Sequence, residues 1–323
     1  MKKVFITSPI SIAGCLITHG FAEGFRKLGY FVIEKDVRET TFEEIENYKP
    51  DYILGYCYGY MVNKNLLEPL MNNEDYSFIH YFGDEPNSRF AYTDNPELFE
   101  LIKTADANIF VWDSEFVSEF EKAHYLPLAV DPKLYKTSFE SYEHNISFVG
   151  RPLTDKRQNI LVRLIKNFGP ISIYSYRDHF ERSINEIIEK NMLSSEELDW
   201  YKASYKGFLK TEEELAKVYN SSKININVTE QGINNINYRV FEVLASSGFL
   251  ITDEMQDLYT NFEVGKELEV YKNEDDLIDK VNFYLKNLNT AQAIARNGRK
   301  NVVNNHSFKD RANKIIKIIE RKS

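Results

Sequence analysis

Short apolar runs that alternate with amphipathic stretches constrain the fold of this chain more than any other feature. Runs of strand length occur at Lys3–Ser8, Tyr30–Glu34, Asp51–Gly55, Ser77–Phe82 and Ala107–Trp112. Stretches with helical spacing lie between them, such as Leu16–Leu28, which is followed by Gly29 as a helix end. This alternation predicts an α/β fold in which a parallel sheet carries helices on both faces.

The alternation weakens between Leu126 and Ser141 and then restarts. The second series predicts strands at Ile146–Val149, Ile171–Tyr174, Ile224–Val228 and Phe249–Thr252. At about 150 residues per domain, 323 residues are enough for two domains. We predict an N-terminal domain over residues 1–130, a C-terminal domain over residues 131–305 and a terminal helix over residues 306–323.

The net charge of −9 lies in the first part of the chain. Residues 1–137 carry 13 Lys/Arg and 22 Asp/Glu, whereas residues 138–323 carry 27 of each. An acidic surface repels phosphates, which disfavours a nucleic-acid partner.

The two cysteines cannot form a disulfide framework or a metal cage by themselves. No apolar run approaches the ~18 residues of a membrane span, and no signal peptide is recognisable, so we expect a cytoplasmic protein.

The loop after Val149 is a candidate anion site. It begins with Gly150 and Arg151, and Lys156 and Arg157 fall in the first turn of the next expected helix. Cations there oppose the helix dipole at a cost of about 0.3–1 kcal/mol each. A bound diphosphate would reverse the sign of this interaction. The alternative is a pair of solvated surface cations.

The segment Asn225–Asp253 is the most informative in the chain. An Asn-rich loop leads into a mostly apolar helix, which Asn237 can cap and Gly248 can end. This helix carries Arg239 and Glu242, which are three positions apart and share a face. A buried carboxylate is costly unless it is paired. Glu242 therefore either pairs with Arg239 or accepts hydrogen bonds from ligand hydroxyls while Arg239 meets phosphate.

The same segment resembles the C-terminal half of GT-B glycosyltransferases, in particular the group of bacterial spore-maturation-type (CgeB-like) transferases. The pattern is Arg239, two residues, Glu242, then small residues and Gly248 before a strand. Further pieces resemble the family in the expected order: Leu126–Tyr135, Ile146–Pro152, Lys206–Asn227 and Ala295–Ile315. The resemblance implies two Rossmann-like domains that face a cleft. The C-terminal domain would bind a nucleotide-diphospho-sugar donor and the N-terminal domain an acceptor.

On this resemblance, Glu242 would bind the donor ribose, and Arg239 and Arg157 would contact the diphosphate. The rest of the implied donor site consists of Gly150, Arg151, Glu230, Asn234, Asn237 and Tyr238. Retaining members carry two glutamates eight positions apart, but position 234 is Asn here. A retaining mechanism is therefore not carried over.

The sequence contains no Asp-x-Asp motif of the kind that holds a cation on a diphosphate. We therefore expect neither a metal nor another cofactor, with the nucleotide sugar as co-substrate. Arg, Lys and helix N-termini would neutralise the diphosphate instead.

In the first half, His80 to Pro86 follows an expected strand. If sugar transfer inverts configuration, it needs a base, and Asp84 is the first candidate, followed by Glu85 and His80. The alternative is that Asp84 and Glu85 are turn residues before Pro86. The loop after the first strand contains Gly14 and His19, which we expect near the acceptor or sugar.

The terminal helix is basic and amphipathic. Residues 296–323 contain 9 Lys/Arg and 2 Asp/Glu, with an isoleucine stripe from Ile315 to Ile319. Such a helix can lie on a membrane, but charge complementarity favours packing against the acidic N-terminal domain.

The function that we predict is transfer of a hexose from a UDP-, GDP- or dTDP-linked donor to a hydroxyl or amide of a glycan, protein or small molecule. A nucleotide-sugar epimerase and a non-catalytic glycan- or protein-binding homologue are the alternatives. A dehydrogenase is disfavoured because no G-x-G-x-x-G follows the first strand.

Overall fold

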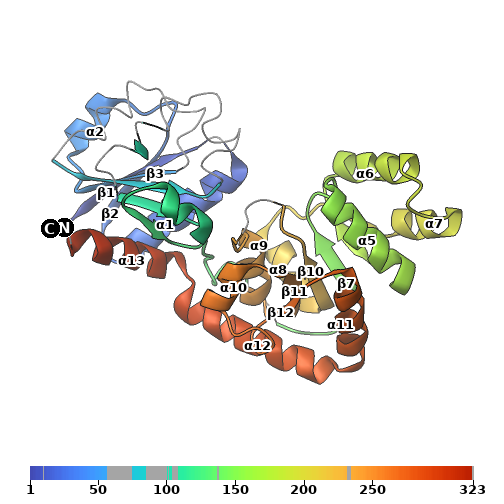
Figure 1. Ribbon diagram of the computed structural model, residues 1–323. Helices are drawn as coiled ribbons and strands as arrows, with labels where there is room; N and C mark the ends of the chain where they lie inside the picture. Colours follow the sequence, from blue (N-terminus) through green and yellow to red (C-terminus); the bar gives the residue numbers. More distant parts are fainter. Residues whose placement is uncertain are drawn as a thin grey trace. The chain divides into compact units, whose positions relative to one another are not determined.

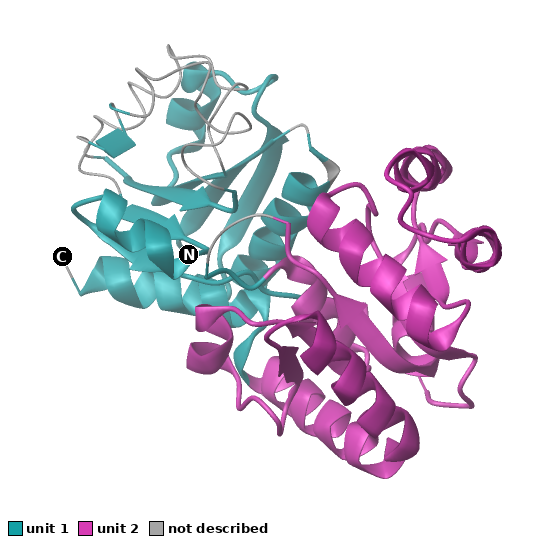
Figure 2. Ribbon diagram, turned by 45° about the vertical axis from the view of Figure 1, so that its right-hand side comes forward, with its two compact units in different colours: residues 1–131, 231–236, 305–323 teal, residues 132–230, 237–304 magenta. Residues whose placement is uncertain are grey.

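Two parallel sheets, each with six strands in the described part of the chain, form the cores of two units (Figures 1 and 2). The computed structural model describes residues 1–321 except 10, 57–74, 85–99, 101, 104–107, 137 and 231–233. Unit 1 comprises residues 1–131, 231–236 and 305–323, and unit 2 comprises residues 132–230 and 237–304. The predicted α/β fold class is confirmed by these two sheets.

Unit 1 has the strand order β2-β1-β3-β4-β5-β6, with every pair parallel. The strands are β1 (Lys3–Ser8), β2 (Phe31–Asp36), β3 (Tyr52–Tyr56), β4 (Ser77–Phe82), β5 (Asn108–Val111) and β6 (Ala123–Tyr125). Its helical elements include α1 (Ile12–Lys27), α2 (Phe42–Tyr48), the 3-10 helix η1 (Ser114–Glu119) and α13 (Phe308–Glu320). Helix α1 ends where the sequence predicts, because Gly29 has a φ of +88° that other residues rarely adopt.

Helix α13 packs against α1 within unit 1, although some 280 residues separate them in sequence (Figure 1). Two glycines of α1 make this contact close. A Cβ on Gly20 would lie 2.3 Å from the Phe308 ring, and one on Gly24 would lie 2.5 Å from the Phe308 carbonyl oxygen. The stripe residues Ile315 and Ile319 are buried here, so the apolar face that could have met a membrane is covered by unit 1.

Unit 2 has the strand order β12-β11-β10-β7-β8-β9, again parallel throughout. Its strands are β7 (His144–Val149), β8 (Ser172–Tyr174), β9 (Tyr205–Gly207), β10 (Ser222–Asn227), β11 (Leu250–Asp253) and β12 (Glu269–Tyr271). Its helices are α5 (Asp155–Phe168), α6 (Arg177–Glu189), α7 (Ser195–Ala203), α8 (Glu212–Ser221), α9 (Tyr238–Ala245), α10 (Gln256–Asn261), α11 (Glu274–Lys286) and α12 (Leu288–Asn305). The apolar residues of β7 and β10 and of the inner faces of α5 and α11 form one core.

Helices α6 and α7, which connect β8 to β9, are not among the elements expected from the sequence. Helix α6 is strongly charged, with Phe180 and Ile187 as its buried apolar anchors. The ring of Phe180 stacks on Tyr201 of α7, with ring centroids 5.1 Å apart. This pair of helices makes the β8–β9 connection long and leaves the residues just after β8 and β9 at the same edge of the sheet.

Candidate functional site

The strand order of unit 2 defines where a ligand is expected. The chain leaves β7 toward β8 on one side and later returns to β10 on the other, so β7 and β10 flank the topological switch point. In such sheets ligands bind outside the carboxyl ends of the strands at this point. Gly150 directly follows β7 with a φ of +149°, and a Cβ there would lie 3.2 Å from Nη2 of Arg239. A glycine is therefore required by both the backbone conformation and the nearby guanidinium.

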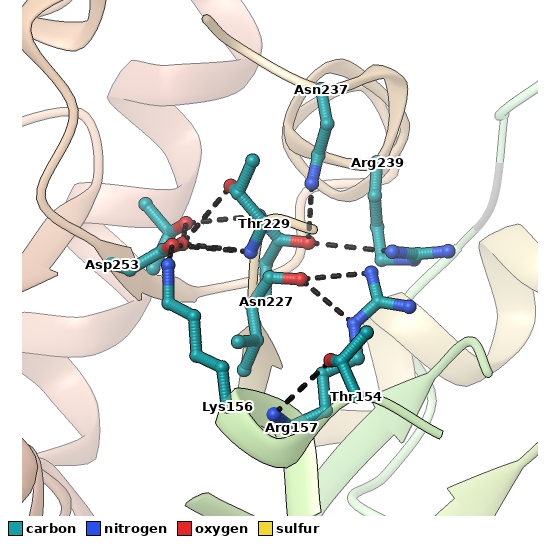
Figure 3. Close-up of polar contacts among 10 residues, drawn as sticks. Thr154, Lys156, Arg157, Asn227, Thr229, Asn237, Arg239 and Asp253 are labelled. Atoms are coloured by element: carbon teal, nitrogen blue, oxygen red, sulfur yellow. Dashed lines mark hydrogen bonds and ion pairs between the residues drawn. The ribbon is translucent and has the colours of Figure 1, made fainter. Parts of the chain in front are cut away.

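Arg239 lies in the first turn of α9, just after β10, and it retains free donor capacity. Its Nη1 donates a long hydrogen bond of 3.4 Å to Oδ1 of Asn227 (Figure 3). The N-cap residue Asn237 donates to the same Asn227 oxygen at 3.0 Å. Within the described part of the chain, the buried Nε of Arg239 and the buried Oδ1 of Asn237 have no hydrogen-bond partner. Buried polar atoms are normally satisfied. Two such atoms side by side at a helix N-terminus indicate a place where a polar ligand completes the structure.

Arg157 does not lie as the resemblance implied. Its Nε and Nη2 donate to the Val228 carbonyl at 3.0 and 2.8 Å, and its Nη1 donates to the Arg151 carbonyl at 3.0 Å and pairs with Glu230 at 2.9 Å. Burial, reinforced by the charge of Arg239, lowers the pKa of Arg157 to about 10, so the side chain remains a cation at neutral pH. These contacts occupy most of the guanidinium, which fixes the loop after β10 rather than facing a ligand.

Glu230 and Arg151 form an ion pair at the loop that follows β10. The Glu230 carboxylate pairs with Arg157 and also with Nη2 of Arg151 at 3.0 Å. The Arg151 side chain is 53% exposed, whereas that of Glu230 is 15% exposed. Arg151 is therefore the member of this group that can turn to a ligand at little cost.

Asp253 at the end of β11 is a site residue that the sequence reasoning missed. Its carboxylate accepts hydrogen bonds from the backbone N–H and the hydroxyl of Thr229 at 3.1 Å, and it pairs with Nζ of Lys156 at 2.6 Å (Figure 3). Asp253 thus fixes the first residues after β10 while it holds Lys156 at the same edge. An Asp at the end of a predicted strand was the available signal for this role.

Glu242 is buried, with an exposed fraction of 8%. It accepts hydrogen bonds from the hydroxyl of Tyr135 at 2.8 Å and, more weakly, from that of Tyr219 at 3.5 Å. Among the described side chains of unit 2, Arg239 does not form an ion pair with it, so the simpler alternative from the sequence is wrong. Burial raises the pKa of Glu242, with Arg239 and Tyr135 opposing the shift. No sequence pattern pointed to Tyr135 or Tyr219 as partners.

The remaining implied donor residues are divided between the units. Tyr238 is the first residue of α9 and is half-buried beside Arg239. Asn234 belongs to unit 1, where its backbone N–H and side chain donate to Asp113 and Glu115 at 3.3 and 2.9 Å.

In unit 1, the three candidate bases have different surroundings. His80 is fully buried within β4, where its ring centroid lies 4.2 Å from that of Phe82, and burial lowers its pKa to about 3. This packing makes His80 a core residue and removes it from the candidates. Asp84 lies two residues after β4 and is half-buried, next to Gly83, where a Cβ would lie 2.3 Å from the Tyr56 hydroxyl. Glu85 lies outside the described residues.

Gly14 and His19 lie on α1. A Cβ on Gly14 would lie 2.4 Å from Cγ of Pro9 and 2.6 Å from Oγ of Ser11, so packing within the loop already requires this glycine. Nδ1 of His19 lies 3.0 Å from a Glu34 oxygen, and its side chain is 62% exposed. His19 thus forms a surface pair with Glu34.

Two features of the described residues bear on membranes and metals. No helix in these segments is long and apolar enough to cross a bilayer. The same segments bring together no group of three or more His, Cys, Asp or Glu side chains that could hold a metal ion.

The chain is similar to known glycosyltransferases in part of its sequence and in its fold. A family model described as "Glycosyl transferase-like" matches residues 160–317, just under half of the chain. This part of the chain is therefore similar to glycosyltransferases, whereas the spore-maturation subgroup stays a prediction. No curated protein sequence matches significantly.

Solved structures match almost the whole chain and share its fold. A glycosyltransferase from Rickettsia africae has a TM-score of 0.70 at 13% identity, with 99% of this chain and 98% of that chain covered. The sucrose-phosphate synthase of Thermosynechococcus elongatus has a TM-score of 0.70 at 11% identity, covering 100% and 99%. Anabaena HepE in complex with UDP has a TM-score of 0.70 at 11% identity, covering 99% and 100%. The fold is that of GT-B glycosyltransferases.

Proposed function

We propose that this protein is a glycosyltransferase that moves a sugar from a nucleotide-diphospho-sugar to a hydroxyl or amide acceptor. The proposal rests on Asn227, Asn237 and Arg239 (the Arg239 cluster) at the switch point of unit 2. Among the described residues, the buried Nε of Arg239 and Oδ1 of Asn237 have no hydrogen-bond partner. The family match to residues 160–317 supports sugar transfer, and HepE, which shares the fold, has been solved with UDP-glucose. A UDP-sugar is accordingly the first donor to test.

The chemistry assigns a separate role to each cation. Breaking the bond between the anomeric carbon and the diphosphate leaves extra negative charge on the nucleoside diphosphate. Arg239, together with the N–H groups at the start of α9, would stabilise that charge without reorganising. Arg151 and Lys156 would add positive charge at the same edge, so that the reaction would need no metal ion. Arg157 would act through the loop that it holds, as a positioning residue.

Two acidic residues would take part in the reaction, one in each unit. Glu242 would accept hydrogen bonds from the ribose hydroxyls, sharing the carboxylate with Tyr135. Asp84 in unit 1 would accept the proton of the acceptor, if the configuration inverts. The acceptor would be a glycan, a protein or a small molecule.

Calorimetric titration with UDP, GDP and dTDP tests the proposal. We expect Arg239→Gln to weaken binding of the preferred nucleotide about 10- to 150-fold, since hydrogen bonds to charged groups contribute about 1.5–3 kcal/mol. Arg163→Gln is the matched control, because Arg163 is a surface arginine of unit 2 that pairs with Asp275 on α11. Absence of binding by all three nucleotides, or equal binding by the Arg239 variant, would refute the proposal. Turnover of the donor without an acceptor would favour the epimerase alternative.

A further inference from the structure

A buried tyrosine lies in an otherwise exposed segment at the start of unit 2. Unit 2 begins at residue 132, and Tyr135 is only 1% exposed. Its neighbours in the segment are exposed, namely Lys133, Leu134 and Lys136. Leu134 is 51% exposed although its side chain is the more apolar. Burial of apolar surface alone therefore does not explain why Tyr135 is the residue of this segment that enters the interior.

The hydroxyl of Tyr135 reaches the carboxylate of Glu242 on α9. It donates a hydrogen bond of 2.8 Å to Oε1, whereas the hydroxyl of Tyr219 on α8 donates to Oε2 at 3.5 Å, a length at which such bonds are weak. A phenylalanine at position 135 would bury the same ring without a polar atom that needs a partner. The tyrosine therefore adds one specific feature, which is this bond to Glu242.

This bond favours the ionised form of Glu242. Burial raises the pKa of Glu242, and the charge of Glu212 on α8 adds to the shift. The charge of Arg239 and the hydrogen bonds from Tyr135 and Tyr219 lower it. Burial also raises the pKa of Tyr135 well above its usual value, so its hydroxyl keeps its proton and remains a donor.

The bond also fixes the orientation of the carboxylate. An ionised carboxylate has about four acceptor positions, and Tyr135 occupies one of them on Oε1. Because one oxygen is held, the carboxylate plane has a preferred direction and the other acceptor positions are oriented with it. Those positions can accept hydrogen bonds from two adjacent hydroxyls of a sugar ring.

We propose that Tyr135 is a positioning residue for the donor, because its hydroxyl holds Glu242 in the orientation in which the carboxylate accepts the ribose hydroxyls. This inference rests on the proposed function, since the ribose must lie at Glu242. It assigns a part in donor binding to the segment that enters unit 2, which lies 107 positions before Glu242.

The experiment compares a nucleotide with a probe that lacks the ribose. Calorimetry is carried out with UDP, or with GDP if the wild type binds it more tightly, and with inorganic pyrophosphate. We expect Tyr135→Phe to bind the nucleotide about 10-fold more weakly, because the orienting bond to a charged group is lost. Pyrophosphate binding should stay unchanged, which also shows that unit 2 of the variant is folded.

The matched control is Tyr201→Phe. Tyr201 of α7 is a fully buried tyrosine of the same unit, and its hydroxyl shares a hydrogen bond of 2.8 Å with Oγ of Ser183. This variant loses an equally buried hydroxyl that does not contact Glu242. We expect it to bind both probes like the wild type.

The pH dependence of binding separates positioning from simple packing. Protonation of Glu242 removes acceptor charge, so nucleotide affinity falls as the pH decreases through the folded-state pKa of this group. Without the bond from Tyr135 that pKa is higher, so in Tyr135→Phe the fall begins at a higher pH. Titration of the nucleotide's own phosphate is the same in both proteins and cancels in the comparison.

The outcomes distinguish this proposal from the proposed function. Weaker nucleotide binding with unchanged pyrophosphate binding and the shifted pH dependence supports the role of Tyr135. Wild-type nucleotide affinity in Tyr135→Phe, an unshifted pH dependence, or an equal loss of pyrophosphate affinity overturns it. If Arg239→Gln still weakens nucleotide binding in that case, the proposed function stands. If UDP, GDP and dTDP all fail to bind the wild type, both proposals fail.

Discussion

The acid sensitivity of unit 1 provides a quantitative test of the position of His80. Burial lowers the pKa of His80 from 6.5 to about 3, so the folded unit keeps this imidazole neutral at pH 5. In the unfolded chain the side chain takes up a proton below pH 6.5. The unfolded state therefore binds more protons, and the free energy of unfolding falls as the pH decreases from 6.5 toward 3.

The size of this effect follows from the pKa difference. Each pH unit below 6.5 costs about 1.4 kcal/mol, so unit 1 should lose about 2 kcal/mol through His80 between pH 7 and pH 5. His80→Leu removes the titrating group and places an apolar side chain beside Phe82. The wild type should therefore lose about 2 kcal/mol more than the variant over this interval.

Urea unfolding followed by tryptophan fluorescence can measure this difference in unit 1 alone. The two tryptophans of the chain are Trp112, which is buried in unit 1, and Trp200 on α7 of unit 2. In a Trp200→Phe background the signal comes from unit 1. Equal losses of stability in the wild type and His80→Leu would refute the argument, because His80 would then titrate as an exposed residue.

Three further predictions concern other parts of the molecule. Because the pKa of Glu242 is raised, its protonated form stabilises unit 2 below pH 4.5, and this contribution is lost as the pH rises through the folded-state pKa. In Glu242→Gln the free energy of unfolding, measured by Trp200 fluorescence in urea, should fall less over this pH range. The same pH dependence in wild type and variant would contradict this prediction. Gly24→Ala should destabilise unit 1 by about 1–3 kcal/mol despite the better helix propensity of Ala, because the new Cβ meets backbone atoms of Phe308; unchanged thermal unfolding would show that α13 can shift freely. Asp84→Asn should bind UDP normally but release no UDP from UDP-glucose in the presence of an acceptor library, and normal turnover would remove Asp84 from the role of base.

The sequence predicted the fold class because the alternation of apolar runs follows directly from burial of parallel strands. It also indicated Gly150, which directly follows an expected strand, and Arg239, which lies near the start of an expected helix. The two helices between β8 and β9 were missed, because α6 has only a narrow apolar face in a highly charged stretch. Short strands such as β9 and β12 contain three residues each and carry too little periodicity to be recognised.

The separate roles of the charged residues could be assigned only from the structure. Arg157 and Arg239 both lie near helix N-termini, and only their hydrogen bonds distinguish them. Arg157 holds the loop after β10, whereas Arg239 has donors that remain available. Glu242 was singled out as a buried carboxylate, but its partners Tyr135 and Tyr219 lie 107 and 23 positions away along the chain. Hydrogen bonds over such separations leave no local pattern, and the same holds for the pairing of Asp253 with Lys156.

The placement of α13 in unit 1 has a consequence for the order in which the chain is made. A ribosome completes residues 1–131 first, but the helix that covers Gly20 and Gly24 of α1 is synthesised after the whole of unit 2. At 5–20 residues per second, this leaves roughly 10–35 s during which unit 1 lacks α13. During that interval, while unit 2 is being synthesised, α1 lacks the contact with Phe308. Unit 2 therefore has its complete sequence before unit 1 does, although unit 1 begins the chain.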